Sequence, residues 1–327
     1  MGCKLEMIAV VIPTYRASKS ILAVLEGIPS QVGCIYVIDD QCPESSGKIV
    51  EAKSLDPRVR VIYHPKNTGV GGAMITGFAA AIRDGAAIVV KIDSDGQMDS
   101  RLLPWLVKPL VEGRADFSKG NRFFDLEVLG RMPFARLLGN AGLSFINKMS
   151  SGYWNVMDPT NGFIAIHARV LKFIPYQRLD RGYFFESDLL FRLGTVRAKV
   201  IDIPMRAKYV VGGVSSMNLP RILLAFPPKF LVRVFKRIAY SYFLRDFNVG
   251  SLAFLGAVIT LPSGVVFGAW SWVIADQAGK LASSGTVMIA GLLIMVGVLS
   301  TLVFLIIDAV STPRSPIHMD LPDYLVD

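Results

Sequence analysis

Two long runs without a charged side chain occupy the C-terminal part of this sequence, Phe247–Ala275 and Leu281–Ile307. A helix needs about 20 residues to cross the hydrocarbon core of a membrane, so each run is long enough to span it. Pro262 and Gly264 lie inside the first run and are tolerated in membrane helices as a local kink. A short polar turn at 276–284 separates the runs. The sequence therefore predicts a transmembrane hairpin over 247–308, with spans at about 249–275 and 283–307.

Positive charge is concentrated just before this hairpin. Five basic residues precede the first span: Lys229, Arg233, Lys236, Arg237 and Arg245. The turn between the spans has Lys280 as its basic residue. By the positive-inside rule, a large domain at 1–218 and a tail at 309–327 are cytosolic. Much of the net charge of +9 is then directed towards lipid, which argues against nucleic acid as a partner.

The segment 229–245 is predicted to be an amphipathic helix. Phe230, Val234 and Ile238 follow helical spacing, while Arg233 and Arg237 fall on another side. We expect interfacial helices over 219–246 that lie on anionic lipid. The alternative is a helix packed on the soluble domain.

The first 200 residues alternate between apolar strand patterns and helical patterns. Strands are expected at 7–12, 34–38, 59–63 and 87–92, and further short strands at 116–122 and 201–204. Strands that alternate with helices at this spacing are typical of an α/β fold with a mainly parallel sheet. Such a sheet brings the carboxyl ends of its strands to one edge, where ligands bind.

Carboxylates follow two of these strands. Asp93 and Asp95 come after the strand at 87–92, and Asp39 and Asp40 end the strand at 34–38. Two hard oxygen ligands at a strand end suit a divalent cation that also holds substrate phosphates. A strand followed by an Asx turn explains Asp93 and Asp95 equally well, because Asp, Ser and Gly are turn formers.

Two further helices carry polar candidates. Met132–Met149 has Arg131 and Arg136 near its start, which suits an anionic group but also an ordinary solvated surface. Tyr183–Leu193 carries Glu186 and Asp188 near its first turn. The three cysteines lack metal-binding spacing, so we expect reduced thiols.

Several strand-end motifs together resemble the family-two glycosyltransferases, and within them the polyprenyl-phosphate glycosyltransferases of the dolichol-phosphate mannose synthase group. The motifs are VVIPTYRAS, VIDDQCPES, NTGVGGAMITGF, KIDSDGQMD, KGNRFF, DPTNGF and GGVSS, in the family's order from about Ala9 to Ser216. The resemblance implies a nucleotide-sugar-binding domain of the GT-A type, a metal and an inverting mechanism.

The resemblance also implies roles for individual residues. Donor-binding positions are Pro13, Tyr15, Asp39, Asp40, Asp93 and Ser94, with Asp39 at the nucleotide base. Metal-binding positions for Mg2+ or Mn2+ are Asp93, Asp95 and Gln97. The acceptor lipid's phosphate would meet Arg122, Arg136 and Asn140. The catalytic residues are then Asp93 and Asp95, with Asp188 as the candidate base should one be needed.

The sequence departs from the family pattern at several places. Arg16 and Ala17 stand where the family often has Asn-Glu, and Asn140 stands where a serine is usual. Near Gly213 the usual diphosphate-binding arginine or lysine is missing, with Val210 and Ser216 in those places. Either the diphosphate relies more on the metal and on Lys208 or Arg206, or the loop is arranged differently.

The expected reaction is transfer of a sugar from a UDP- or GDP-linked donor to a polyprenyl phosphate, for cell-envelope glycan biosynthesis. The expected location is the cytoplasmic face of a bacterial inner membrane. One alternative is a membrane-attached glycosyltransferase with a hydroxyl acceptor, for which Asp188 is the first candidate base and Glu186 the second. Another is a non-catalytic nucleotide-sugar-binding membrane subunit, which the intact set of Asp93, Asp95 and Gln97 disfavours. Glycine-rich faces such as those of Gly291 and Gly297 make a homo-oligomer possible.

Overall fold

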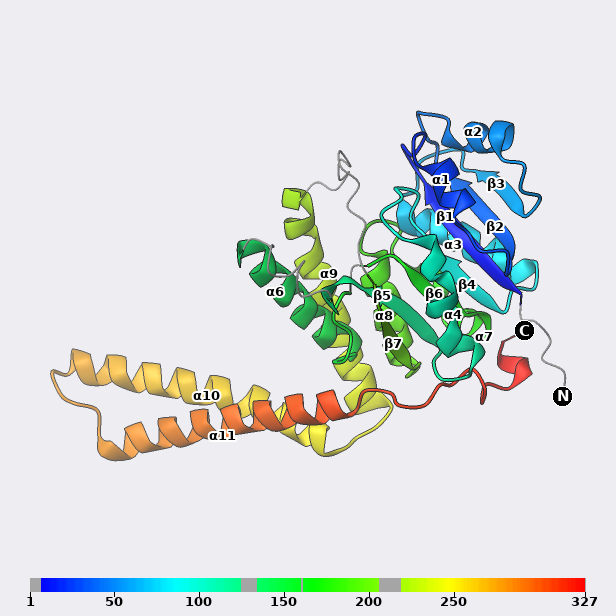
Figure 1. The fold of residues 1–327 in the computed structure, drawn as a ribbon. Helices are drawn as coiled ribbons and strands as arrows, with labels where there is room; N and C mark the ends of the chain where they lie inside the picture. Colours follow the sequence, from blue (N-terminus) through cyan, green and yellow to red (C-terminus); the bar gives the residue numbers. More distant parts are fainter. Residues whose placement is uncertain (1–6, 125–133, 160, 206–218, 327) are drawn as a thin grey trace. The chain divides into compact units, whose positions relative to one another are not determined.

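A computed structural model describes residues 7–124, 134–159, 161–205 and 219–326, with side chains omitted at 134–138 and 219–224. The chain divides into two compact units (Figure 1). The first, the catalytic unit, comprises Met1–Val234 and Pro313–Asp327, and the second comprises Phe235–Thr312. Arg131, Arg206, Lys208 and Gly213 lie outside the described residues, as does the side chain of Arg136.

A seven-stranded sheet forms the centre of the catalytic unit, in the order β3-β2-β1-β4-β6-β5-β7. The strands are β1 (Ile8–Thr14), β2 (Val32–Asp39), β3 (Val59–Tyr63), β4 (Ile88–Lys91), β5 (Phe117–Asn121), β6 (Ile164–His167) and β7 (Val200–Pro204). Strand β6 is antiparallel to both of its neighbours, and the other pairs are parallel. The mainly parallel sheet predicted from the sequence is therefore confirmed, with one reversed strand.

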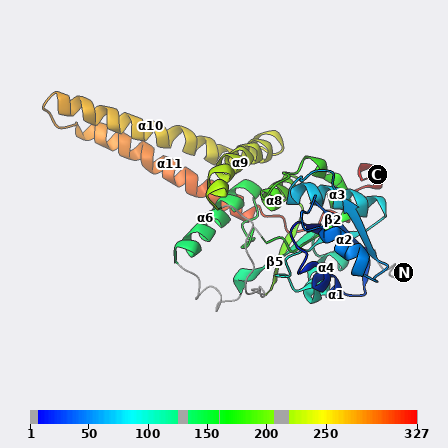
Figure 2. The same cartoon turned by 90° about the horizontal axis from the view of Figure 1, so that it is seen from above.

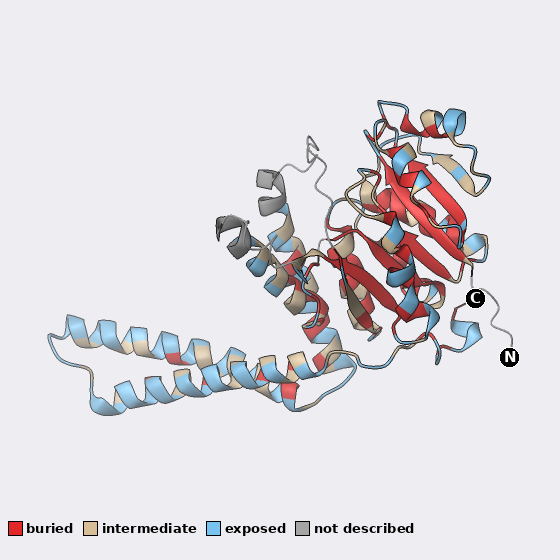
Figure 3. Ribbon diagram, viewed as in Figure 1, coloured by how far each residue is buried: buried red, intermediate tan, exposed pale blue. Residues whose placement is uncertain are grey.

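Helices cover both faces of the sheet. The helices that precede the hairpin are α1 (Ile21–Glu26), α2 (Ser46–Lys53), α3 (Val70–Arg83), α4 (Leu103–Val111), α6 (Phe134–Ser151), α7 (Ala168–Phe173), α8 (Phe185–Thr195) and α9 (Leu219–Ala239). Figure 2 shows α3 and α8 on one side of the sheet and α1 and α4 on the other. Buried side chains concentrate on the central strands (Figure 3). Strands β1, β2, β4 and β6 are mostly apolar along their length because both faces of the sheet are covered there.

Helix α9 contains most of the segment for which an amphipathic interfacial helix is expected. It begins at Leu219, the first residue of the segment 219–246 in which interfacial helices are expected, and contains Pro227 and Pro228. Within the catalytic unit, Lys229 pairs with Asp180 and Arg233 pairs with Asp188. These two basic side chains therefore meet carboxylates of the chain itself. On its surface the helix exposes the basic Lys236 together with large apolar side chains, Leu231, Val232 and Phe235.

The second unit is a helical hairpin of α10 (Val249–Gln277) and α11 (Ser284–Val310), preceded by a π-helical turn at Tyr240–Leu244. Both helices are long and apolar enough to cross a membrane. A Cβ added at Gly297 would lie 2.6 Å from the backbone nitrogen of Leu261, so the two helices pack closely there. Gly297 thus serves contacts inside the hairpin. At the base of the hairpin, Arg237 holds Asp308 through two hydrogen bonds of 2.7 and 2.9 Å.

The residues after α11 belong to the catalytic unit. The backbone nitrogens of Ile317 and His318 donate to the carboxylate of Asp116, and the His318 ring stacks on His167 at 4.2 Å. Leu321 and Val326 are buried in the same apolar cluster as the sheet residues. The tail is therefore an integral part of the catalytic unit.

Candidate active site

The carboxyl end of β4 carries a buried lysine between two carboxylates. The Lys91 ammonium lies 2.6 Å from Asp93 Oδ1 and 3.1 Å from Glu186 Oε1. Its side chain is 1% exposed, whereas those of Asp93 and Glu186 are 31% and 13% exposed. Burial lowers the pKa of Lys91, but the two carboxylates more than offset this and leave the pKa raised. Lys91 is therefore a fixed positive charge at the strand end.

A glycine closes this cluster from β6's side. A Cβ added at Gly162 would lie 2.1 Å from Lys91 Nζ and 2.6 Å from Asp93 Oδ2. Only a residue without a side chain leaves room for the ammonium and the carboxylate here, which gives the glycine of DPTNGF a steric reason.

Asp95 is an exposed carboxylate just beyond this cluster. Its Oδ1 accepts a hydrogen bond of 2.9 Å from the backbone nitrogen of Gln97, so an Asx turn is present. Although Asp95 keeps an exposed surface, protein atoms displace part of the water around its carboxylate, and this together with the nearby charge of Asp93 raises the pKa of Asp95. A bound cation would relieve both effects.

The donor set fits a divalent cation that is shared with a substrate. Among the described residues no group of three or more His, Cys, Asp or Glu side chains could hold a metal. The chain would thus offer Asp95, with Asp93 and Gln97 nearby, and phosphate or water would complete the shell. Mg2+ is commonly bound in this way, through one or two carboxylates plus substrate phosphates.

Asp39 and Asp40, at the end of β2, organise the neighbouring loops. Asp39 is buried, and its two oxygens each accept a hydrogen bond of 2.7 Å, from the backbone nitrogens of Cys42 and Gly47. Asp40 is buried too, and accepts from the backbone nitrogens of Thr68 and Gly69. The register pairs Thr14 of β1 with Asp39, so these loops lie beside the end of β1.

The remaining predicted donor residues lie at the same edge of the sheet. Pro13 is a buried residue near the end of β1, and Tyr15 just after it is 42% exposed. The Arg16 guanidinium lies over the Tyr15 ring, 5.4 Å from its centroid. The carbonyl of Ser94 accepts a hydrogen bond of 2.6 Å from Ser20 Oγ, which fixes the loop after β4 against the start of α1.

On the predicted acceptor side, Arg122 is held by a carboxylate. Its Nε and Nη2 lie 2.7 and 2.9 Å from the oxygens of Asp158, in a bidentate pair. Asn140 lies on α6 and is partly exposed. Behind Arg122, burial lowers the pKa of Lys119 to about 8, although nearby carboxylates oppose the shift. The Lys119 ammonium donates to the backbone carbonyl of Asp158.

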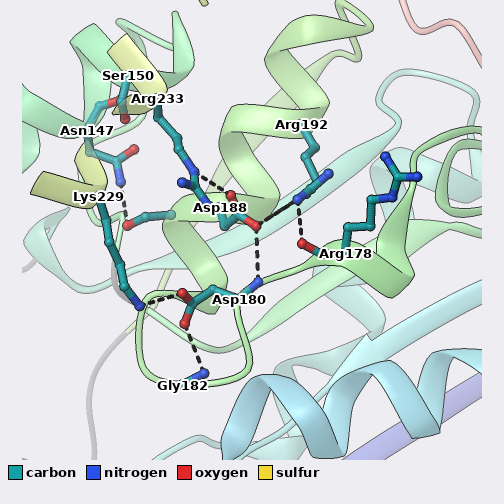
Figure 4. A network of polar contacts seen from close by, with 10 residues as sticks. Asn147, Ser150, Arg178, Asp180, Gly182, Asp188, Arg192, Lys229 and Arg233 are labelled. Carbon is teal, nitrogen blue, oxygen red and sulfur yellow. Dashed lines mark hydrogen bonds and ion pairs between the residues drawn. The ribbon is translucent and has the colours of Figure 1, made fainter. Parts of the chain in front are cut away.

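Asp188, the first candidate base, is fully buried in a polar network (Figure 4). Its Oδ1 accepts from Arg233 Nε at 2.8 Å, and its Oδ2 accepts from Arg192 and from the backbone nitrogen of Asp180. An acceptor hydroxyl would have to displace these partners to reach it. The geometry thus gives Asp188 a bracing role, and Glu186 is the more accessible carboxylate of the pair.

Three consecutive residues at the start of α8 make three separate connections. Glu186 pairs with Lys91 of β4. Ser187 accepts a hydrogen bond of 2.8 Å from Asn147 of α6 (Figure 4). Asp188 pairs with Arg233 of α9. The first turn of α8 therefore joins the end of β4 to both α6 and α9.

Lys91 and Lys119 were not recognised as site residues from the sequence. Each interrupts a strand whose other residues are buried, and buried lysines require partners. That interruption was the available signal. The partner Glu186 lies 95 residues from Lys91 and could not be identified from spacing.

Solved structures confirm the predicted fold. Glucosyl-3-phosphoglycerate synthase from Mycobacterium tuberculosis, in complex with Mn2+, uridine diphosphate and glucosyl-3-phosphoglycerate, matches with a TM-score of 0.52 and 21% identity. The match covers 71% of this chain and 80% of that one. It shows that the catalytic unit has the fold of GT-A glycosyltransferases.

Sequence relatives cover about three fifths of the chain. UDP-N-acetylglucosamine--dolichyl-phosphate N-acetylglucosaminyltransferase of Methanococcus voltae is 28% identical over 62% of this chain and 86% of its own length. Undecaprenyl-phosphate mannosyltransferase of Micrococcus luteus is 27% identical over 60% of this chain and 81% of its own length. Finally, the family profile described as glycosyl transferase family 2 matches residues 9–174, slightly more than half of the chain. With this match and the strand-end site that lies within it, the chain belongs to glycosyl transferase family 2.

Proposed function

We propose that this glycosyltransferase moves a sugar, with inversion, from a UDP- or GDP-linked donor to a polyprenyl phosphate at the cytoplasmic face of a membrane. The observation that carries the proposal is an exposed apolar hairpin on a chain whose catalytic unit belongs to family 2. Two of its relatives are named for transfer to dolichyl or undecaprenyl phosphate, acceptors that reside in membranes.

The hairpin supports membrane attachment. Large apolar side chains are exposed along both helices, including Val266 and Trp270 on α10 and Leu299 and Ile306 on α11. Soluble proteins rarely expose apolar patches of this extent. The chain enters α10 from the catalytic unit and returns to it after α11. The start of α10 and the end of α11 are therefore expected on the same side of the membrane, as a two-span topology requires.

On the donor side, the end of β4 and the loops held by Asp39 and Asp40 would receive the nucleotide sugar. Asp95, with Asp93 and Gln97, would hold Mg2+ or Mn2+. When bound, the cation would neutralise the charge that develops on the leaving diphosphate. Because Asp93 is already paired with Lys91, Asp95 is the carboxylate most available to a cation that also binds the diphosphate.

On the acceptor side, the geometry favours a phosphate. A phosphate monoester is largely ionised at neutral pH, so it needs orientation more than a base. Asp188 is fully buried and paired with two arginines, which suits a reaction that needs no base at that position. Arg122, Arg136 and Asn140 are the proposed phosphate contacts.

The test is incubation of membranes that contain the protein with radiolabelled nucleotide sugars and undecaprenyl or dolichyl phosphate, followed by lipid extraction. We expect metal-dependent label in the lipid fraction, released by mild acid as a sugar phosphate ester would be. Acid-stable label on a glycolipid would instead establish the hydroxyl-acceptor function, with Glu186 as the base to test. Donor binding without any transfer would instead support the alternative of a non-catalytic nucleotide-sugar-binding subunit.

A further inference from the structure

We propose that Lys91 is a positioning residue of the transfer reaction, a role that rests on the proposed function. Its ammonium connects Asp93, on the donor side, to Glu186 on the first turn of α8. The next residue of that turn, Ser187, is attached to α6, which carries the proposed acceptor contacts. Lys91 would thereby set the spacing between the donor and the acceptor.

The position of Lys91 in β4 explains why it reaches α8. Successive side chains of a strand point to opposite faces, so Lys91 shares a face with Val89. Val89 packs in the apolar cluster that also contains Phe185, Leu189 and Leu190 of α8. The lysine side chain therefore extends under the start of α8, and its charged end meets the carboxylates there.

The charges make this connection rigid. Without the ammonium, Asp93 and Glu186 would be two like charges in a largely buried place, and they would separate. With it, both are held by short contacts of 2.6 and 3.1 Å, and Gly162 leaves no spare volume beside them. A buried lysine with two carboxylate partners is held in one side-chain conformation, whereas a surface lysine adopts many.

The prediction for Lys91→Met is a split between binding and turnover. Asp95 remains, so the affinity for nucleoside diphosphate with Mn2+ should stay within about threefold of wild type. Turnover should fall about 100-fold, the penalty typical of a 1 Å misplacement of reacting groups. Lys108→Met is the matched control, because Lys108 is exposed and contacts residues of its own neighbourhood, Glu112 in an ion pair and the Trp105 ring.

Glu186→Gln provides a second variant that keeps the volume and leaves Lys91 paired with Asp93. If Glu186 acts through Lys91, its turnover should fall to a similar level, and the double variant should be no worse than Lys91→Met alone. A much larger loss in Glu186→Gln than in Lys91→Met would overturn the proposal, because it would make Glu186 a base. Unchanged turnover in well-folded Lys91→Met would also overturn it.

Hydrogen–deuterium exchange supplies a measurement that needs no acceptor. Amides of the first turn of α8 should exchange faster in Lys91→Met, while those of α10 should be unchanged. Unchanged exchange at α8 would overturn the positioning role even if wild-type transfer is detected. Faster exchange at α8 together with no transfer by the wild-type protein would support the connection and reject the proposed function instead.

Discussion

A single methyl group at Gly162 tests the geometry of the active site most directly. The backbone of Gly162 is compatible with alanine, because its φ does not lie in the left-handed region. The added Cβ would lie 2.1 Å from Lys91 Nζ, whereas ordinary contacts begin at 3.4 Å, so the ammonium must move by more than 1 Å. Because Asp93 Oδ2 is also within 2.6 Å of that Cβ, the carboxylate must move with it.

The expected losses differ in size for folding and for catalysis. The ammonium ends a flexible side chain, so the stability loss should lie near the lower end of the 1–3 kcal/mol typical of overpacking, about 1 kcal/mol. That corresponds to a decrease in Tm of about 2–4 °C for a domain of this size. Turnover should fall by about 100-fold, because the displaced group lies at the donor site.

The assay compares Tm and initial transfer rates at saturating donor for wild type, Gly162→Ala and Gly291→Ala. Gly291 is the matched control, because no described atom lies within 4 Å of a Cβ built there. We expect Gly291→Ala to behave as wild type. A Gly162→Ala protein with wild-type turnover would refute the reasoning, since the lysine and its carboxylates would then tolerate displacement.

Three further predictions concern other parts of the molecule. Asp95→Asn should weaken Mn2+-dependent binding of nucleoside diphosphate at least about tenfold, because contacts with charged groups contribute roughly 1.5–3 kcal/mol; equal affinities in titration calorimetry would reject the metal assignment. Burial first, and then the charge of His318, lower the pKa of His167 to about 4 from its usual value of 6.5. The stability that neutral His167 contributes is therefore fully present above pH 6.5 and is lost as the pH falls towards 4. His167→Asn, which can still accept from the backbone nitrogen of Arg169, should therefore flatten the dependence of Tm on pH in that window, and an unchanged slope would contradict this. Asp308→Asn should cost about 3–5 kcal/mol, because it removes the carboxylate charge that pairs with the buried Arg237 guanidinium. In detergent, the double variant Arg237→Met/Asp308→Leu should recover most of the Tm, and a double variant as unstable as the single one would speak against the pair.

The sheet and its functional edge could be predicted from the sequence, because buried parallel strands are continuous apolar runs and their ends carry polar residues. The strand at Val59–Tyr63 was expected with the bounds that the structure has. The reversal of β6 could not be predicted, since a strand of four residues carries no local signal for its direction.

The sequence does not show which residues, distant along the chain, pair with one another in the fold. Helical spacing shows which basic residues of α9 share a side, but it does not show what faces them. Arg233 meets Asp188, which lies 45 residues away. The sequence makes Asp188 a candidate base because it lies near a helix start, and only its ion pair with Arg233 of α9 shows that this carboxylate is already paired.

The return of the tail to the catalytic unit determines how a soluble version should be made. A protein that stops before α10 would lose Leu321 and Val326 from the apolar cluster, and Asp116 would lose its hydrogen bonds from Ile317 and His318. Such a truncation would expose core surface and aggregate for reasons unrelated to the membrane. If the hairpin is instead excised and a flexible Gly/Ser linker joins the segment before it to Pro313, the tail keeps its contacts with the core of the catalytic unit.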